Sequence, residues 1–374
     1  DHMIENVIGR FTLPMGVGIN FVINGKDYVI PMVTEEPSVV AACSNAAKMA
    51  RPGGGFTTDY TGSVMISQIQ LLDVPAPFYA KGKILENKEK IAEICNARDP
   101  MLVKLGGGVK DVEVRVLDSL VGPMVVVHLL VDTGDAMGAN AVNTMAEAVA
   151  PFLEELTGGR AELRILSNLA DHRIARARAV FKKDAIGGEE VVDKMIAAYA
   201  FAAADPYRAA TNNKGIMNGI IPVVIATGND TRAIESGAHA YAARSGQYSP
   251  FATWEKNADG DLVGSIEMPM AVGLVGGATK IHPAAKVAVK MLGVKTAGEL
   301  AQIIAAVGLA QNMAAMRALA TEGIQRGHMS LHARNLAATA GATGELLEKI
   351  VKQMVSEKNV RLEYAQELVK QYQK

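Results

Sequence analysis

The sequence predicts an α+β fold, in which a β-α-β-β-α-β module lies within a chain that is otherwise rich in helix. Three observations predict it. Short strand-like segments and two segments with helical periodicity follow one another between residues 62 and 168. From residue 190 onward the chain is rich in alanine and mostly helical in pattern. The residues from Gly344 to Lys374 are charged and amphipathic, which is typical of a small helical appendage.

The first elements are a hairpin and a helix. In FVINGKDYVIPMV, residues 21–33, the Asn-Gly pair at 24–25 is the favoured two-residue turn between β-branched and aromatic residues. A helix is expected over about 38–49, with Pro37 at its first turn, where the missing N–H of proline costs little.

The module at 62–168 contains four expected strands and two expected helices. The strands span 64–74, 111–117, 123–132 and 161–166, and the helices span 86–98 and 140–156. This order is the ferredoxin-like pattern.

The region after residue 190 is expected to be interrupted twice, by a strand at 223–228 and by a hairpin at 251–270. Two long helices are expected within 296–322, with Gly308 and Gly323 as breaks.

Charge and cysteine content narrow the function classes. The 38 basic and 39 acidic residues give a net charge of −1, and no long run of like charge occurs. We therefore expect no nucleic acid and no membrane as partner. Two cysteines make no disulfide framework, and no secretion signal or stretch of about 20 apolar residues is visible. These observations predict a cytoplasmic protein that acts on small molecules.

DAMGAN, residues 135–140, lies between an expected strand and an expected helix. The free N–H groups and positive dipole end of a helix N-terminus suit an anion such as a pyrophosphate. Gly138 removes a side chain where a ligand would approach. An ordinary strand-to-helix turn would have the same composition, and no G-x-G-x-x-G fingerprint occurs in the chain.

Two further segments carry charges that could act in a site. In DPYRAATNNKGIMNG, 205–219, Arg208 suits a carboxylate and Lys214 suits an oxyanion, although a surface loop with two solvated bases is an equal alternative. In ATGNDTRA, 226–233, Asp230 lies just past an expected strand, where catalytic side chains often lie. The alternative for this aspartate is the N-cap of the next helix.

The last two segments contain histidines and paired glutamates. In RGHMSLHARN, 326–335, His328 precedes an expected helix, whose N-terminus disfavours the imidazolium form. A plain surface histidine is the alternative. His332 follows one turn later, but no HExxH motif or cysteine accompanies the pair, so no metal site is expected. In VTEEPSVVAA, Glu35 and Glu36 precede an expected helix and complement its dipole.

Taken together, these segments resemble the 3-hydroxy-3-methylglutaryl-coenzyme A (HMG-CoA) reductase family. The matching segments are ENVIG (5–9), TEEPSVVAA (34–42), DAMGAN (135–140), SNLADHR (167–173), NNKGIMNG (212–219), ATGND (226–230) and GHMSLHARN (327–335). The similarity covers essentially the whole chain from Ile4. The EEPS form of the glutamate motif and the extended C-terminal appendage resemble the soluble, prokaryotic class II of the family.

The resemblance implies an organisation into domains. Residues 1–61 and 169–328 would form a helix-rich domain that binds HMG-CoA, with a ferredoxin-like NAD-binding domain inserted at 62–168 and a mobile flap at 329–374. It also implies a homodimer with the active site at the subunit interface near ENVIG, or a trimer of such dimers.

The resemblance further implies an NAD-dependent oxidoreductase that interconverts HMG-CoA with mevalonate and coenzyme A by two hydride transfers. A developing oxyanion needs a fixed positive charge, and the carbonyl oxygen and the departing thiolate need protons. By resemblance, Lys214 stabilises the oxyanion and Glu36 is the acid for the carbonyl oxygen. Asp230 pairs with Lys214, and His328 protonates the CoA thiolate.

The resemblance also names binding residues. The HMG moiety would be held by Ser38, Asn168, Arg208, Asn218 and Gln311. The cofactor would lie against Asp99, Asp135, Met137, Gly138 and Asn140. A carboxylate at Asp99 would bind the ribose 2′-hydroxyl and repel a 2′-phosphate, which predicts NADH over NADPH. A simple turn residue before Pro100 is the alternative for Asp99.

Two other function classes predict different residues. A non-catalytic acyl-CoA or nucleotide-binding protein on this fold would lack at least one of the four catalytic residues, and all four are present. A CoA thioester hydrolase would need a nucleophile–base pair, but Cys43 and Ser44 have no identifiable histidine partner in the sequence.

Overall fold

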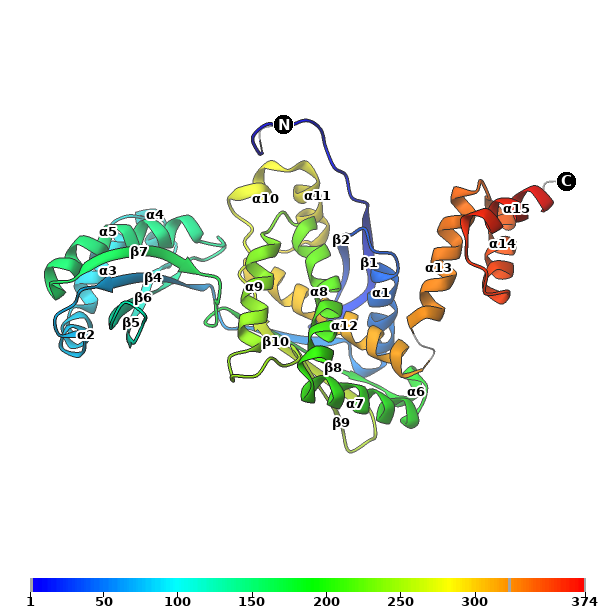
Figure 1. Cartoon of the computed structure of the whole chain (residues 1–374), viewed down its shortest axis with the longest axis horizontal. Coiled ribbons are helices and arrows are strands. Elements are labelled where there is room, and N and C mark those ends of the chain that lie inside the picture. Colours follow the sequence, from blue (N-terminus) through cyan, green and yellow to red (C-terminus); the bar gives the residue numbers. More distant parts are fainter. Residues whose placement is uncertain (1–2, 322–323, 373–374) are drawn as a thin grey trace.

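The computed structural model describes residues 3–321 and 324–372, with the side chains of Ala278 and of residues 324–331 outside the described part. Within these residues two β-sheets organise an α+β fold (Figure 1). The large sheet has six strands in the order β2-β1-β3-β8-β10-β9, and the small sheet has four in the order β5-β6-β4-β7. The small sheet and its helices form the left part of the molecule in Figure 1.

The large sheet begins with the predicted hairpin. Its strands are β1 (Met15–Ile23), β2 (Lys26–Val33), β3 (Phe56–Tyr60), β8 (Ile174–Phe181), β9 (Ala252–Lys256) and β10 (Leu262–Pro269). Asn24 (φ 50°) and Gly25 (φ 79°) form the turn between β1 and β2 with the positive φ that such a turn requires. The antiparallel pair β9–β10 confirms the hairpin predicted at 251–270.

Helices pack against this sheet and against one another. They are α1 (Val39–Ala50), η1 (Arg51–Gly53), α6 (Lys183–Ile186), α7 (Glu189–Ala204), α8 (Pro206–Ala226), α9 (Thr231–Ala242), α10 (Gly277–Ile281), α11 (Pro283–Leu292) and α12 (Ala297–Ala320). α12 packs against α1, α7, α8 and three strands, and every residue from Ile303 to Met313 is buried. Although α12 is long and apolar enough to cross a membrane, 67% of its apolar window is buried inside the protein, as in the core helix of a globular domain.

Two predictions for this region are wrong. Residues 223–228 form the end of α8 and the turn after it, not a strand. A short apolar run fits a buried helix as well as a buried strand, and packing against α12 selects the helix. Residues 297–320 form one helix, not two. Gly308 lies inside this helix, where the missing side chain allows α8 to pack closely. A Cβ at this position would lie 2.8 Å from Ile220 Cδ1 on α8.

The small sheet confirms the predicted ferredoxin-like order. Its strands are β4 (Val64–Leu72), β5 (Gly108–Leu117), β6 (Met124–Asp132) and β7 (Arg160–Ser167), and its helices are α2 (Pro77–Glu86), α3 (Lys88–Asn96), α4 (Pro100–Lys104) and α5 (Ala139–Thr157). All pairs in this sheet are antiparallel. The sequence predicted one helix where α2 and α3 follow each other.

The C-terminal helices α13 (Ile324–Thr339), α14 (Gly344–Ser356) and α15 (Leu362–Tyr372) form the predicted appendage. They share a hydrophobic cluster separate from the main core, with Ala337, Ile350 and Leu368 among its buried members. The appendage lies at the opposite end of the molecule from the small sheet (Figure 1). Residues 3–14 form neither helix nor strand, and the side chains of Met3, Ile4, Val7, Ile8 and Phe11 are exposed.

Candidate active site

Three predicted residues meet at one point. Glu36 lies between β2 and α1, and Lys214 and Asn218 lie one turn apart on α8. Lys214 Nζ donates to Glu36 Oε2 at 2.9 Å, and Asn218 Nδ2 donates to Glu36 Oε1 at 3.1 Å. The Lys214 side chain is 63% exposed and that of Glu36 is 34% exposed. A carboxylate and an ammonium group are therefore fixed against each other at an accessible surface.

The segment that carries Lys214 is helical rather than a loop. Asp205 starts α8 as its N-cap, with Oδ1 accepting from Tyr207 N at 3.1 Å, and Pro206 occupies the first helical position. Asn212 and Asn213 are buried, and Asn213 binds the backbone of Ser249 and Phe251. The asparagines therefore divide between core contacts and the Glu36 cluster.

Two further predicted residues carry buried polar atoms without a partner. Ser38 has the left-handed conformation (φ 78°), and its Oγ has no hydrogen bond. Gln311 on α12 is 6% exposed, and its Oε1 also lacks a partner. The described residues contain three buried side-chain polar atoms without a hydrogen-bond partner, and the third, Ser67 Oγ, does not belong to a predicted site residue. Unpaired buried polar atoms and backbone strain are rare and concentrate at ligand sites.

The remaining predicted substrate residues, Arg208 and Asn168, differ in setting. Arg208 lies on the first turn of α8 and is half-buried, and this burial lowers the pKa of its guanidinium. Asn168 is exposed in the β7–β8 connection, where its carbonyl oxygen would lie 2.4 Å from a Cβ on Gly237 of α9. No hydrogen bond joins either residue to the Glu36 cluster in the described part of the chain.

Within one chain, the ion pairs of Lys214 and Asp230 are with Glu36 and Arg232, respectively, so their pairing with each other stays a prediction. Asp230 Oδ1 accepts from Arg232 N at 2.9 Å and from Ala233 N at 3.2 Å, so it caps α9. Because α8 precedes it, the predicted position after a strand is wrong, and the N-cap alternative is confirmed. Lys214 and Ala226, at the end of α8, are twelve positions apart in the helix, which corresponds to roughly 18 Å. The side chain of His328, on α13, lies outside the described residues.

A pocket of about 550 Å³ gathers four of the five predicted cofactor residues, Asp99, Met137, Gly138 and Asn140. It lies where β6 leads into α5, as the DAMGAN motif predicted. Gly138 has φ 98°, and a Cβ there would lie 2.3 Å from Thr133 Cγ2. Only glycine fits this position without displacing its neighbours.

The residues that line this pocket differ from the predicted set in two ways. The carboxylate of Asp135 does not line the pocket, since its Oδ1 accepts from Ala297 N at 2.7 Å at the start of α12. Val275, Gly276 and Gly277 line the pocket and were not predicted. The Gly-Gly pair after an apolar run was the available signal for them.

Asp99 lines this pocket and also starts α4. Its Oδ1 accepts from Leu102 N at 2.9 Å, so the carboxylate acts as an N-cap, in line with the turn alternative. Its second oxygen has no hydrogen bond within the described residues. The two interpretations of Asp99 are therefore compatible.

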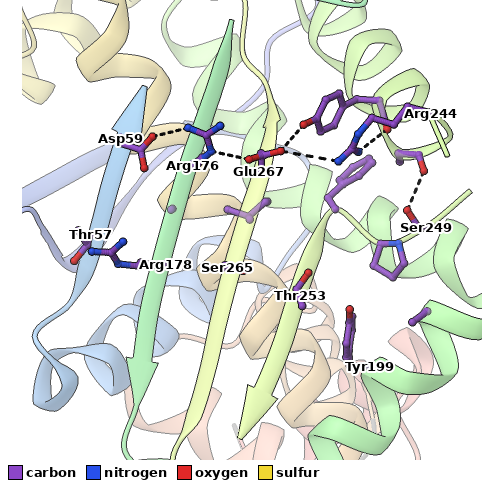
Figure 2. Close-up of a pocket in the computed structure, with 17 residues that line it drawn as sticks. Thr57, Asp59, Arg176, Arg178, Tyr199, Arg244, Ser249, Thr253, Ser265 and Glu267 are labelled. Carbon is purple, nitrogen blue, oxygen red and sulfur yellow. Dashed lines mark hydrogen bonds and ion pairs between the residues drawn. The ribbon is translucent and has the colours of Figure 1, made fainter. Parts of the chain in front are cut away.

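A second pocket, of about 510 Å³, lies on the open face of the large sheet (Figure 2). Arg176 at its centre donates to Glu267 Oε2 at 2.6 Å and to Asp59 Oδ1 at 3.0 Å, and Glu267 also accepts from the Tyr241 hydroxyl. None of the predicted site residues lines this pocket. In the described residues, no three His, Cys, Asp or Glu side chains are placed to hold a metal ion.

Comparisons with known proteins identify the family of the chain. The family model of hydroxymethylglutaryl-coenzyme A reductase matches residues 1–333. The chain is 64% identical over 369 residues to the 3-hydroxy-3-methylglutaryl-coenzyme A reductase of Archaeoglobus fulgidus, covering 99% of this chain and 84% of the relative. It is 39% identical over 346 residues to the probable enzyme of Borreliella burgdorferi, covering 90% of this chain and 77% of the relative.

Solved structures extend the likeness to the fold. The class II enzyme from Streptococcus pneumoniae, bound to NADPH in open conformations, superposes with a TM-score of 0.84 at 43% identity, covering 100% of this chain and 91% of that one. A second structure from this organism gives a TM-score of 0.85 at 43% identity, covering 99% and 89%. The chain therefore belongs to the hydroxymethylglutaryl-coenzyme A reductase family, with a fold like that of the class II enzyme.

Proposed function

We propose that the protein interconverts HMG-CoA with mevalonate and coenzyme A in two successive hydride transfers, using a nicotinamide dinucleotide. The observation that carries the proposal is the cluster in which Lys214 and Asn218 both donate to Glu36. The test is a spectrophotometric assay at 340 nm with HMG-CoA and each reduced nicotinamide, and with mevalonate, CoA and each oxidised one. Absence of dinucleotide turnover in both directions would refute it.

In the proposed reaction Lys214 stabilises the negative charge that develops on the thioester and aldehyde oxygens, because a fixed ammonium group needs no reorganisation as charge appears. Glu36 in its protonated form delivers the proton to the carbonyl oxygen and becomes the carboxylate that accepts from Lys214 and Asn218. Asn218 supports this by fixing the Glu36 carboxyl group through its second oxygen. His328 is proposed as the proton donor to the CoA thiolate.

Substrate binding is proposed to use the unpaired buried atoms near this cluster. Ser38 follows Glu36 by two residues, and a Cβ on Gly219, next to Asn218, would lie 2.7 Å from Gln311 Cβ. Hydroxyl and carboxylate groups of an HMG moiety would satisfy both side chains. Arg208 would bind the free carboxylate, since a guanidinium forms paired hydrogen bonds with it. Asn168 is a further proposed contact.

A nicotinamide dinucleotide, when bound, supplies or accepts the hydride, and the pocket at the start of α5 fits this group. Gly138 leaves space that a Cβ would fill, and the first turn of α5 has no side-chain cap, so its N–H groups are free for a phosphate. We propose residues 62–168 as the domain that binds it and residues 1–61 and 169–328 as the domain that binds HMG-CoA. Met137 and Asn140 would line the bound cofactor, with Asp135 holding the loop.

NADH is proposed as the preferred cofactor because Asp99 offers an unpaired carboxylate oxygen at the pocket. That charge would accept a hydrogen bond from a ribose 2′-hydroxyl and would repel a 2′-phosphate. The test is the ratio of kcat/KM for NADH and NADPH in the unaltered chain and in Asp99→Asn. Equal use of the two cofactors by the unaltered chain would remove this part of the proposal.

We infer that the active site is completed by a second copy of the chain. Lys214 lies in the first half of α8 and Asp230 lies beyond the C-terminal end of this helix, so their pairing needs the aspartate of another protomer. Ile8, within ENVIG, and Phe11, just after it, are 104% and 93% exposed and would be covered in such a dimer. Dimers could assemble further as a trimer of dimers.

A complementation experiment tests this inference. Lys214→Ala and Asp230→Ala chains are each expected to be inactive, whereas co-expressed chains should regain about a quarter of the activity, because half the dimers are mixed and each has one intact site. No recovery, with dimers present in sedimentation, would refute the shared site.

The helices α13–α15 are proposed as a flap that closes over the thioester and carries His328. Their separate hydrophobic cluster supports a unit that moves as a body, and the positive φ of Gly341 (95°) and Gly344 (56°) belongs to the turn between α13 and α14 inside it. Unchanged turnover after deletion of residues 345–374 would refute it. Both cysteines are free and buried, which supports the proposed cytoplasmic location.

A further inference from the structure

Arg173, at the end of the SNLADHR motif, is a buried cation without a charged partner. Its side chain is 0% exposed. Its acceptors are Tyr60 Oη at 2.7 Å, Thr133 Oγ1 at 3.1 Å, and the carbonyl oxygens of Ala136 at 3.2 Å, Met137 at 3.1 Å and Val272 at 2.5 Å. No carboxylate in the described residues forms an ion pair with it. Its hydrogen bonds are satisfied, but its charge is not neutralised.

This arrangement is costly unless it serves a purpose. Buried charges in proteins are normally paired, and replacing a buried ion pair with apolar residues of similar volume is often neutral or stabilising. The position joins β3, the β6–α5 turn and the segment after β10, all of which an apolar side chain could also hold by packing. Holding these segments together therefore does not by itself explain why a positively charged side chain is buried at this position.

The contacts of Arg173 converge on the wall of the dinucleotide pocket. Ala136 and Met137 line that pocket, and their carbonyl oxygens both accept from Nη1. Because the C=O and N–H of a trans peptide point in opposite directions, holding Met137 O on the guanidinium turns the Gly138 N–H away from it. Thr133 strengthens the turn by donating to Ala136 O at 3.0 Å while accepting from Arg173.

We propose that Arg173 is a positioning residue for the dinucleotide, which fixes the Ala136–Gly138 turn and gives the pocket a positive potential for an anionic ligand. The inference rests on the proposed function for the identity of this pocket. Because Arg173 is 0% exposed, water screens its charge less than it would screen that of a surface arginine, so the charge acts more strongly on an anion in the neighbouring pocket. Two effects follow, one from hydrogen-bond geometry and one from charge.

The test separates these effects. NADH and NADPH are titrated by fluorescence into the unaltered chain, Arg173→Lys, Arg173→Gln and Thr133→Val, without HMG-CoA and at several salt concentrations. Arg317→Lys is the matched control, because its guanidinium also bonds a backbone carbonyl, that of Ile186, far from the pocket in sequence. Melting temperature and circular dichroism are recorded for each chain, and the KM for HMG-CoA is measured separately.

We expect Arg173→Gln to weaken dinucleotide binding at least about tenfold and to flatten its salt dependence, while the KM for HMG-CoA changes less than about threefold. Arg173→Lys should keep the salt dependence but lose part of the affinity, and Thr133→Val should lose affinity alone. The control should bind as the unaltered chain does.

Folded Arg173→Gln with unchanged dinucleotide affinity would overturn the inference, as would equal shifts in the constants for dinucleotide and HMG-CoA, which indicate a structural role only. If Arg173→Gln does not fold, Arg173→Lys and Thr133→Val decide, and unchanged affinity in both overturns it. If the unaltered chain binds neither dinucleotide, the proposed function itself fails, and this inference fails with it.

Discussion

Lys214 Nζ donates a hydrogen bond of 2.9 Å to Glu36 Oε2 across 178 positions of sequence. The other oxygen of Glu36 accepts from Asn218, one turn further along α8. A cation and a carboxyl group are thus held together by a helix whose packing against α12 is fixed by the core. Such preorganisation makes the roles of the two side chains separable by substitution.

Lys214→Met is expected to lower kcat by about 10²–10³, because it removes the fixed positive charge that stabilises the oxyanion. The fold should survive, since the side chain is 63% exposed. Steady-state kinetics measure kcat, and a melting curve for each chain measures the stability of the fold. The control is Lys194→Met, on the exposed pair with Glu190 of α7, which should leave kcat unchanged.

Glu36→Gln is expected to lower kcat by about 10²–10⁴ with little change in the KM for HMG-CoA, because the amide can still accept a hydrogen bond but cannot deliver the proton. Asn218→Ala should have a smaller effect, since it leaves the acid in place and removes only one of its supports. A kcat for Glu36→Gln within threefold of the unaltered enzyme would remove Glu36 from the reaction.

Ser38→Gly should be more stable than Ser38→Ala by about 1 kcal/mol, because the φ of 78° at this position is favourable only for glycine. Both variants lose the unpaired hydroxyl, so both should raise the KM for HMG-CoA. Urea unfolding gives the difference in the free energy of unfolding. If the two variants are equally stable, the position carries no backbone strain in solution.

Gly138→Ala is expected to destabilise the protein by about 2–4 kcal/mol and to weaken dinucleotide binding, because the new Cβ meets Thr133 Cγ2 in a left-handed backbone position. Gly134→Ala is the matched control in the same turn: its φ is also positive, at 56°, but no atom lies within 4 Å of the new Cβ. It should cost only about 1 kcal/mol. Equal unfolding energies for the two variants would contradict the close approach.

His128 is expected to make the protein less stable as the pH falls. Its burial, and secondarily the charge of Arg115, lower the pKa of this histidine below the ordinary 6.5, and Gln68 Nε2 donates to its Nε2 at 2.9 Å. The unfolded chain therefore takes up a proton more readily than the folded one. The contribution is present above pH 6.5 and is lost as the pH falls toward the lowered value.

The free energy of unfolding is measured by urea unfolding at several pH values between 8 and 5. In His128→Gln this free energy should depend less on pH in the acidic half of the range. The same substitution at the exposed His172 is the control and should leave the profile as it is. A profile for His128→Gln that matches that of the unaltered chain would show that this histidine does not govern the acid sensitivity.

The elements that the sequence predicted well have local signals. The turn at Asn24-Gly25 needs positive φ at two positions. The segment that became β5 alternates between apolar and polar residues, as in a strand with one buried face, and the segment that became β6 is an apolar run, interrupted only by His128, that is buried from residue 125 to residue 131. The DAMGAN turn combines a strand end, a glycine and a helix start, so its place at a pocket followed from short-range chemistry.

The failures have long-range causes. The end of α8 is a continuous apolar run, and α12, β2 and α7 all pack against this helix. A run without polar positions lacks the periodicity that distinguishes a helix from a strand. In the sequence, Gly308 is typical of a helix break. In the fold it lies within a helix, because Ile220 of α8 occupies the space that a side chain would fill. Arg173 gave no signal of its own, because its five acceptors come from segments that only the tertiary fold assembles.

α8 carries Lys214 in its first half and ends just before Asp230, so the helix sets both the distance and the rotation about the helix axis between these two functional groups. Deleting one residue between positions 215 and 225 would shorten this spacing by about 1.5 Å and rotate the lysine relative to the aspartate by about 100°. In the proposed dimer each protomer uses the helix of the other as its reference, so one such deletion would misalign both catalytic centres at once.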